Sequence, residues 1–594
     1  MTRRRPIGAE CTAGGVDFRV WAPDHKELTV VIDGSDYPLD RESDGHFSGV
    51  VANARAGTLY RFRLDRSRET FPDPASRFQP EGPHGPSQVV DPTAHRWRAS
   101  NPRLDKLVIY EMHIGTFTRE GTWRAAIDKL EPLAEIGINL LEIMPVSEFP
   151  GRFGWGYDGV DLWAPTRLYG APDDFRHFVD SAHALGVGVI LDVVYNHFGP
   201  DGCYWKNYAR DYFTDRYTNE WGDAINFDAG GVREFFSENA GYWIDEFRLD
   251  GLRLDATQSI NDRCPEHIIA LLQRRAREAA RDRSIVIVAE NEPQEVQLVT
   301  RYGLDALWND DWHHTAMIAA GGRREAYYTD YRGTPQEFIS AARHGFLYQG
   351  QRYRWQKRRR GTPAHLPPEK FICYIQNHDQ VANSAAGLRL QSVTSPGHFR
   401  ALTALLILGP NTPMLFQGQE FAASTPFLYF ADHKTELAAA VDKGRRDFMR
   451  QFRSIDVDKL AKPHDPTTFE RCKLDHSERE RHAEAVAMHR DLLRLRREID
   501  FSAVDGAVLS ASAFLLRYSD SHLLLVNLGD RLVLEVAAEP LLAPPESSRW
   551  AVQWSSEPLA EPVEVDDDPS WRIPAESAVL MRAVAAAAVF SKST

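Results

Sequence analysis

Cysteine is scarce in this sequence. Five cysteines occur among 594 residues, and no two of them form a CxxC pair. They are Cys11, Cys203, Cys264, Cys373 and Cys472. Because their number is odd and their spacing is wide, the sequence predicts neither a disulfide framework nor a zinc site. A reducing cytoplasm is therefore the expected compartment.

Long hydrophobic runs are also missing. No stretch approaches the roughly 18 apolar residues that are needed to cross a bilayer. The N-terminal residues, MTRRRPIGAE, are basic but lead into no apolar segment of the kind that a secretory signal contains. The sequence therefore predicts neither a membrane partner nor a secretory leader.

Positive charge is in deficit. The chain has 70 Lys and Arg against 84 Asp and Glu, which gives a formal net charge of −14 and no general attraction to nucleic acid. One basic run, RYRWQKRRR from Arg352 to Arg360, stands out. We interpret it as a solvated loop or a contact with the acidic body of the protein rather than as a nucleic-acid patch.

The length and composition indicate a globular protein of several domains. A single core stops growing at roughly 250–300 residues, so 594 residues must divide. Short β-branched and aromatic runs at 16–22 and 28–33 alternate with Asp-Gly turns, and a proline-rich stretch at 71–92 follows. These features predict a β-sandwich domain, immunoglobulin-like and similar to carbohydrate-binding modules, at residues 1–95.

From residue 106 onward, short apolar strands alternate with helical segments such as 123–137 and 173–186. Such alternation indicates parallel strands joined by helical crossovers. Eight strands are expected, which is the number in a TIM barrel. They cover residues 107–117, 138–146, 187–197, 247–255, 284–290, 304–310, 371–379 and 412–420. The barrel, with inserted loops, is assigned to residues 96–490.

After the barrel, the pattern changes again. A helical segment at 482–499 leads into short strands at 513–518 and 522–529. A small all-β domain is therefore expected at residues 500–594. The predicted fold class is a multidomain protein with a central (β/α)8 TIM barrel between N-terminal and C-terminal β-sandwich domains.

Polar residues end four of the expected barrel strands. Arg253 and Asp255 lie two residues apart and so share one face of a strand. An arginine beside an aspartate keeps the carboxylate ionised, as a nucleophile requires. Glu290 ends an apolar strand, where a raised pKa suits a general acid.

The other two polar ends lie on the third and seventh strands. Asp192, Asn196 and His197 follow one another along ILDVVYNH, and FICYIQNHD ends on Asn377, His378 and Asp379. Any one of these residues alone is more often a helix cap or a structural ion pair. Together, at the C-terminal ends of strands 3, 4, 5 and 7, they predict an active site.

The segments DVVYNH, GLRLDA, VAENE and QNHD resemble the four ordered motifs of the α-amylase superfamily, glycoside hydrolase family 13. The resemblance extends from about Leu107 to Glu420. It implies that Asp255 is the nucleophile, Glu290 the general acid/base and Asp379 a third carboxylate that grips sugar hydroxyls. A retaining pair of this kind stands about 5–5.5 Å apart.

The same resemblance implies further substrate-binding residues. Arg253 corresponds to the group that positions the nucleophile, and Tyr157 in GWGYDG to an aromatic that stacks under the sugar, with a core tyrosine as the alternative. The other predicted binders within the motifs are His197, His378, Asp192 and Asn377. The reaction requires no cofactor. Asn196 matches a calcium-binding position of some amylases, but no acidic cluster accompanies it, so no metal is predicted.

Four loops resemble those of the maltooligosyltrehalose trehalohydrolase subgroup of this family. They are NHFGPDGCYW, WGDAINFD, WNDDWHH and TPFLYFADH. The subgroup implies release of trehalose from maltooligosyl trehalose, and a pathway partner, maltooligosyltrehalose synthase, that makes this substrate. Trp308, Asp310 and Asp311 in WNDDWHH are predicted to grip the disaccharide. Gln419 departs from the acidic residue that many relatives carry there.

Two alternatives remain open. A 1,4-α-glucan branching enzyme would use the same residues for transglycosylation, and GYWIDEFRLDGLRLD is shared with such enzymes. A catalytically silent carbohydrate-binding protein is the alternative from another class. It predicts the loss of one of the three carboxylates, whereas all three are present in the sequence.

Overall fold

The computed structural model describes residues 3–363, 365–384, 386–560, 563–565 and 568–586. The chain divides into two compact units. The first comprises residues 1–307, 427–448 and 457–477, and the second comprises residues 308–426, 449–456 and 478–594. Each unit is described by itself. Among the described residues, no helix is long and apolar enough to cross a membrane.

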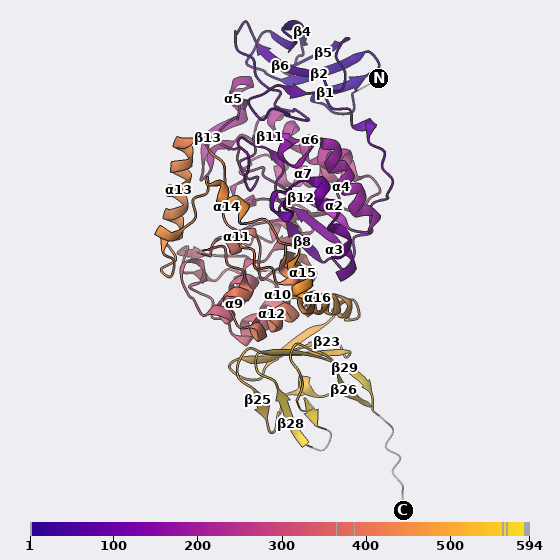
Figure 1. Ribbon diagram of the computed structural model, residues 1–594, viewed down its shortest axis with the longest axis vertical. Coiled ribbons are helices and arrows are strands. Elements are labelled where there is room, and N and C mark those ends of the chain that lie inside the picture. The colour runs from indigo at the N-terminus through magenta and orange to yellow at the C-terminus, as the bar shows by residue number, and fades with distance from the viewer. Residues whose placement is uncertain (1–2, 364, 385, 561–562, 566–567, 587–594) are drawn as a thin grey trace, which may run out of the picture. The chain divides into compact units, whose positions relative to one another are not determined.

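An antiparallel β-sheet forms the N-terminal part of the chain (Figure 1). Its strand order is β1-β2-β5-β4-β3-β6-β7. The strands are β1 (Gly8–Thr12), β2 (Gly15–Trp21), β3 (Leu28–Ile32), β4 (Ser35–Arg41), β5 (His46–Val51), β6 (Leu59–Leu64) and β7 (Ser87–Gln88). Phe18 of β2 packs edge-on against Phe62 of β6, with ring centroids 6.4 Å apart. Because β2 and β6 are not neighbours in the sheet, this contact shows that the sheet folds over its own apolar face.

Eight parallel strands form a closed barrel in the order β12-β15-β16-β17-β20-β21-β8-β9. They are β8 (Ile109–Met112), β9 (Leu140–Ile143), β12 (Gly188–Val193), β15 (Gly251–Leu254), β16 (Val286–Ala289), β17 (Ala306–Trp308), β20 (Phe371–Cys373) and β21 (Thr412–Phe416). Each lies inside one of the eight strands predicted from the sequence. The prediction of a TIM barrel is confirmed.

Helices connect the strands within each unit. The first unit contains α4 (Pro172–Ala184), α6 (Gly230–Glu246) and α7 (Ile268–Ala280), and the second contains α9 (Asp310–Gly321), α10 (Pro335–His344), α12 (Pro396–Leu408) and α16 (Ala483–Arg496). In α4, Pro172 is the first helical residue, and the Asp174 carboxylate accepts the Ala171 N–H at 2.9 Å. These caps satisfy the backbone donors that a helix end leaves without intrahelical partners.

Two predicted elements differ in detail. The strand expected at 107–117 ends at Met112, and Ile114–Phe117 form the short helix α1. The helix expected at 123–137 is two helices, α2 (Trp123–Ile127) and α3 (Leu130–Ile136). Periodicity alone does not place the ends of short elements, because a short buried strand and a short buried helix give the same pattern.

Gly251 allows β15 to enter the barrel beside β16. Its φ is 155°, and a Cβ at this position would lie 1.8 Å from the carbonyl oxygen of Val286. Gly251 and Val286 are register partners in the parallel pair. Only glycine permits so close an approach of the two backbones. This contact aligns β15 and β16, whose C-terminal ends carry Asp255 and Glu290.

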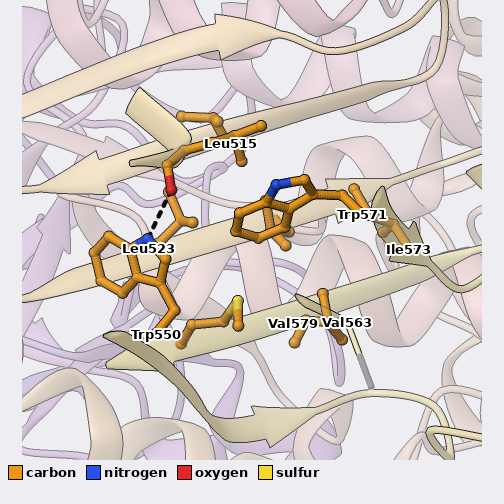
Figure 2. Close-up of a cluster of buried hydrophobic side chains, with 10 residues drawn as sticks. Leu515, Leu523, Trp550, Val563, Trp571, Ile573 and Val579 are labelled. Atoms are coloured by element: carbon orange, nitrogen blue, oxygen red, sulfur yellow. Dashed lines mark hydrogen bonds between the residues drawn. The ribbon is translucent and has the colours of Figure 1, made fainter. Parts of the chain in front are cut away.

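The C-terminal part is a sandwich of two sheets, one ordered β22-β23-β24-β29-β26 and the other β25-β28-β27. The strands are β22 (Val504–Val508), β23 (Ala513–Tyr518), β24 (His522–Asn527), β25 (Leu532–Leu534), β26 (Ser548–Ser555), β27 (Glu564–Val565), β28 (Asp568–Ile573) and β29 (Ser577–Ala585). Figure 2 shows the core, where Trp571 and Ile573 meet Leu515, Leu523 and Val579. The indole N–H of Trp550 donates to the Leu542 carbonyl at 2.8 Å.

Candidate active site

Arg253 lies at the centre of a network of carboxylates in the first unit. It is the register partner of Asp192 on the neighbouring strand, and its side chain is fully buried. Its Nη1 donates to Asp192 Oδ1 at 2.9 Å, to Asp192 Oδ2 at 2.8 Å and to Asp255 Oδ1 at 2.6 Å. Its Nη2 lies 3.0 Å from Glu290 Oε2. One guanidinium therefore contacts the three carboxylates at the ends of β12, β15 and β16.

This network is stable because the charges compensate one another. Burial alone lowers the pKa of Arg253, but Asp192, Glu290 and Asp255 raise it well above its usual value. Burial raises the pKa of Asp192 to about 6, against the opposing effect of Arg253. A buried ion needs such partners, since the desolvation of an unpaired charge costs several kcal/mol.

Asp255 is held at both carboxylate oxygens. Oδ1 accepts from Arg253, and Oδ2 accepts from Asn196 Nδ2 at 2.8 Å. Asn196 Nδ2 also lies 3.0 Å from the Asp255 backbone carbonyl. Asp255 is 9% exposed. The carboxylate is therefore oriented and almost dry, as a nucleophile requires. The role of Asn196 was not predicted from the sequence, although its position next to His197 was the available signal.

Glu290 is fixed by an unusual backbone conformation at Ala256. The φ of Ala256 is 40°, in the left-handed region that non-glycine residues rarely adopt. Its N–H donates to Glu290 Oε2 at 3.0 Å. The Glu290 side chain is 23% exposed, more than that of Asp255 at 12%. Glu290 thus keeps access to solvent, which an acid/base that activates water requires.

Tyr157 and His197 join the same network. The Tyr157 hydroxyl donates to Asp192 Oδ2 at 2.7 Å, and His197 Nε2 lies 3.0 Å from the Tyr157 carbonyl. Burial lowers the pKa of His197, so its ring is neutral at pH 7 and Nε2 donates to the carbonyl. Tyr157 is half-buried. Asp192, predicted to bind substrate, instead holds Arg253 and Tyr157 from within the barrel.

Trp221 is an exposed aromatic residue that the sequence did not single out as a binder. It lies between β13 (Phe213–Asn219) and β14 (Gly222–Ile225), and its ring stacks on His197 with centroids 5.3 Å apart and planes at 29°. Asn219 Nδ2 donates to the Asn196 carbonyl at 2.6 Å and so anchors the hairpin. Trp221 is 45% exposed. It provides a flat apolar surface beside His197.

In the second unit, Asp379 lies on the helix α11 (His378–Ala382). Its side chain is 44% exposed, and its Oδ2 lies 3.6 Å from His378 Nε2. Asn377 Oδ1 accepts the Gln380 N–H at 2.8 Å and caps this helix. The Trp308 ring lies 6.2 Å from that of His378. Asn377 therefore positions the helix, while the Asp379 carboxylate remains open to solvent.

Asp310 and Asp311, both predicted binders, have different environments. Asp311 is fully buried, and its Oδ2 accepts the Leu347 N–H at 2.6 Å and the Tyr348 N–H at 3.2 Å. Its Oδ1 lies 3.3 Å from Arg360 Nη1. Asp311 therefore serves the structure. Asp310 is half-buried and accepts the Tyr374 hydroxyl at 2.5 Å.

The basic run at 352–360 is divided between surface and interior. Its last residue, Arg360, is buried against Asp311. The preceding part forms the hairpin of β18 (Arg352–Tyr353) and β19 (Arg358–Arg359), in which Arg352 faces Arg359.

The structure thus places Arg253, Asp255, Glu290, Asp192, His197 and Tyr157 together in the first unit. In the second unit, it places Trp308 next to His378, the neighbour of Asp379. The meeting of Asp379 with Asp255 and Glu290 around one sugar stays a prediction.

The barrel and this network define a class of protein. Residues 86–223 match the family model "Alpha amylase, catalytic domain", which spans Tyr157, Asp192 and His197. The crystal structure of a Salmonella typhimurium protein superposes with a TM-score of 0.88 at 35% identity, covering 97% of this chain and 100% of that chain. A pullulanase from Anoxybacillus shares the fold, with a TM-score of 0.72 at 17% identity. The chain is an α-amylase-type glycosidase.

Curated relatives narrow this class. The malto-oligosyltrehalose trehalohydrolase of Deinococcus radiodurans is 40% identical over 507 residues, which cover 83% of each chain. That of Saccharolobus solfataricus is 37% identical over 506 residues, covering 83% of this chain and 87% of the relative. The chain belongs to the malto-oligosyltrehalose trehalohydrolase family.

Proposed function

We propose that this protein hydrolyses the α-1,4-glucosidic bond next to the terminal trehalose unit of maltooligosyl trehalose, releases trehalose, and retains the anomeric configuration. The observation that carries the proposal is the single guanidinium that contacts both Asp255 and Glu290. It keeps two carboxylates close together at neighbouring strand ends, as a double-displacement glycosidase requires.

In the first step, Asp255 attacks the anomeric carbon of the glucose next to the trehalose unit. The bond to O4 of the trehalose unit breaks, and Glu290 gives its proton to that oxygen. A glucosyl ester of Asp255 remains, and trehalose leaves. In the second step, Glu290 takes a proton from water, which attacks the same carbon and breaks the ester. Two inversions at one carbon give net retention.

The other residues of the site act by binding. We assign Asp379 to the hydroxyls of the reacting glucose and Tyr157 to its apolar face. His378 is assigned a hydrogen bond to the same sugar. His197, predicted to bind this sugar, supports Tyr157 instead, because its ring nitrogens face the Tyr157 carbonyl and Asn196 Oδ1. Asp192 and Asn377 take part indirectly, because the first holds Arg253 and Tyr157 and the second caps the helix that carries Asp379.

The choice of a trehalose-ended substrate rests on the relatives and on the segment 308–314. Seven curated relatives at 34–40% identity carry the trehalohydrolase name. We assign Trp308 and Asp310 to recognition of the disaccharide. Asp311 is left out of this assignment, because its carboxylate is occupied by Arg360 and two backbone N–H groups.

A glucan branching reaction is the second candidate. The 1,4-alpha-glucan branching enzyme of Rhodococcus jostii is 30% identical over 70% of this chain and 61% of the relative. Incubation with maltooligosyl trehalose and, separately, with amylose distinguishes the two. Trehalose released from the first substrate supports the proposal. Branched glucan formed from amylose without any trehalose contradicts it and supports the alternative, and no product from either contradicts both.

The nucleophile is tested by Asp255→Ala. We expect turnover to fall by several orders of magnitude, on the scale seen when a catalytic nucleophile is removed. Glu278→Ala, an exposed carboxylate on α7 that is paired with Arg274 at 2.9 Å, is the control and should keep its turnover. Near-normal turnover in Asp255→Ala would show that another residue is the nucleophile.

We also propose that the protein works in the cytoplasm beside a maltooligosyltrehalose synthase that makes its substrate. In support, none of the five cysteines, all of which lie among the described residues, forms a disulfide, as expected in a reducing compartment. Fractionation of cells that carry the native protein tests the location, and accumulation of maltooligosyl trehalose after deletion of this gene tests the pathway. Activity confined to a secreted fraction would contradict the first claim.

A further inference from the structure

A segment that follows the last barrel strand holds the loop that carries Tyr157. We call residues 427–433 the strap and residues 149–158 the Tyr157 loop. Trp155 Nε1 donates to the Leu428 carbonyl at 3.0 Å, and the Asp432 N–H donates to the Phe153 carbonyl at 3.0 Å. Gly154 and Ala431 form an antiparallel bridge. The strap therefore pairs with the loop along most of its length.

Side chains strengthen this pairing. Asp432 Oδ2 accepts from both the backbone N–H and the Nε of Arg152, each at 2.9 Å. Trp155 stacks on Phe427, with centroids 5.5 Å apart and planes at 24°. These contacts fix the beginning and the middle of the Tyr157 loop. The end of the loop, where Tyr157 joins the catalytic network, is held by a separate contact.

That contact is an ion pair between His433 and Asp158. His433 Nε2 lies 3.4 Å from Asp158 Oδ2, and the His433 side chain is only 3% exposed. Asp158 directly follows Tyr157, whose hydroxyl and carbonyl are bound by Asp192 and His197. The end of the loop is thus held by Asp192 and His197 from within the barrel and by His433 from the strap.

The groups that face His433 favour its charged form. Asp158, Asp201 and Asp432 raise its pKa above the usual 6.5, although burial alone lowers it. Asp201 is itself paired with Lys434 Nζ at 2.8 Å and with His84 Nε2 at 3.2 Å, and Asp432 is paired with Arg152. These two aspartates are therefore partly neutralised, and Asp158 is the direct partner of His433.

We propose that His433 is a positioning residue, whose imidazolium holds Asp158 and thereby fixes Tyr157 under the reacting sugar. The proposal rests on the function proposed above, because it assumes that Tyr157 contacts the substrate. In this proposal, His433 acts through Asp158 and Tyr157 rather than by contact with the sugar or the two reacting carboxylates. Its effect appears in substrate binding, and it is present at low pH and lost as the pH rises and the imidazolium loses its proton.

The test compares His433→Asn and Asp158→Asn with the wild-type protein. Hydrogen–deuterium exchange of a peptide that covers residues 149–158 is measured without substrate at one slightly acidic pH. We expect severalfold faster exchange in both variants, and no further increase when the two are combined, because they remove the same contact. His25→Asn removes a comparable pair with Asp65 on the N-terminal sheet and is the matched control. It should exchange like the wild type in this peptide.

Kinetics provide the second readout. In His433→Asn, KM for maltooligosyl trehalose should rise roughly three- to tenfold while kcat changes less, as expected for the loss of a positioning contact. The KM of the wild type should rise with pH, that of His433→Asn should not, and His433→Lys should keep the low KM to higher pH. Wild-type exchange in His433→Asn overturns the proposal. Faster exchange with no trehalose release by the wild type would refute the proposed function and leave the strap contact standing.

Discussion

Arg253 and Glu290 are joined by a 3.0 Å ion pair, and the same guanidinium binds Asp255 at 2.6 Å. Asp255 and Glu290, the proposed nucleophile and acid/base, therefore share one buried counter-charge. In such an arrangement, a change of charge on one carboxylate alters the electrostatic interaction of the other carboxylate with Arg253. In the proposed reaction, the loss of charge at Asp255 on ester formation leaves Arg253 paired with Asp192 and Glu290.

Replacement of Arg253 tests this arrangement. Lysine keeps the charge but has one ammonium group in place of the planar fork that serves three carboxylates. We expect Arg253→Lys to lower kcat/KM about a thousandfold or more and to destabilise the fold by about 3–5 kcal/mol, as when a buried ion pair is broken. Arg275→Lys, at the half-buried pair with Glu238, is the control. Arg253→Lys with kcat/KM within tenfold of wild type would contradict the shared role.

Asp192 predicts a dependence of stability on pH. Burial raises its pKa from 3.8 to about 6 in the folded protein. Between these values the folded chain holds a proton that the unfolded chain has lost, so the free energy of unfolding falls as the pH rises through this window. Relative to Asp192→Asn, the wild type should lose about 2–3 kcal/mol between pH 4 and 6. The difference in unfolding free energy between the two proteins, measured in denaturant, checks this; a flat difference would contradict it.

Substitutions of the adjacent residues Asp310 and Asp311 are expected to have different effects on stability and on KM. Asp311→Asn leaves Arg360 buried beside a neutral group, which should cost about 3–5 kcal/mol of stability. Asp310→Asn should leave stability within about 0.5 kcal/mol and raise KM for the trehalose-ended substrate. Thermal unfolding and KM, measured for both variants, show which aspartate stabilises the fold and which one binds substrate. A stable Asp311→Asn with a raised KM would reverse the two assignments.

The sequence predicted the barrel well, because each buried strand is a short apolar run between helical segments, and four of these strands end on polar residues. Asp255 and Glu290 were identified in this way. The partners of these residues were not. Asn196 reaches Asp255 through its side-chain amide, and Ala256 reaches Glu290 through a left-handed backbone conformation that periodicity does not encode. The exposed Trp221 comes from a hairpin with no barrel signal.

Asp311 shows the opposite failure. The two aspartates are adjacent in WNDDWHH, and the sequence alone makes them equally good candidates for substrate binding. Only the packing of the fold determines which one is buried. The Tyr331 hydroxyl and Arg360 come from segments 20 and 49 residues further along the chain. Such long-range partners determine whether a carboxylate binds a ligand or a neighbour, and one sequence without its fold does not reveal them.

Trp221 is expected to bind sugar through its exposed face. Stacking of this kind contributes about 0.5–1.5 kcal/mol beyond area burial. Trp221→Ala should therefore raise KM roughly three- to tenfold, with less effect on kcat, whereas Trp221→Phe keeps a flat ring and should retain most of the affinity. Steady-state kinetics of both variants on maltooligosyl trehalose provide the measurement. Equal KM values for wild type and Trp221→Ala would exclude this residue from substrate binding.

The central claim is that Asp255 becomes covalently glucosylated, while Glu290 protonates the leaving oxygen and then accepts a proton from water. The most direct measurement is the mass of the peptide that contains Asp255 after Glu290→Gln is incubated with an α-maltosyl fluoride, whose leaving group needs no acid. With ester hydrolysis slowed, we expect a maltosyl adduct on Asp255 and none in Glu290→Gln/Asp255→Asn. An adduct on a different carboxylate, or turnover of the fluoride by the double variant at the rate of the single variant, would contradict the account.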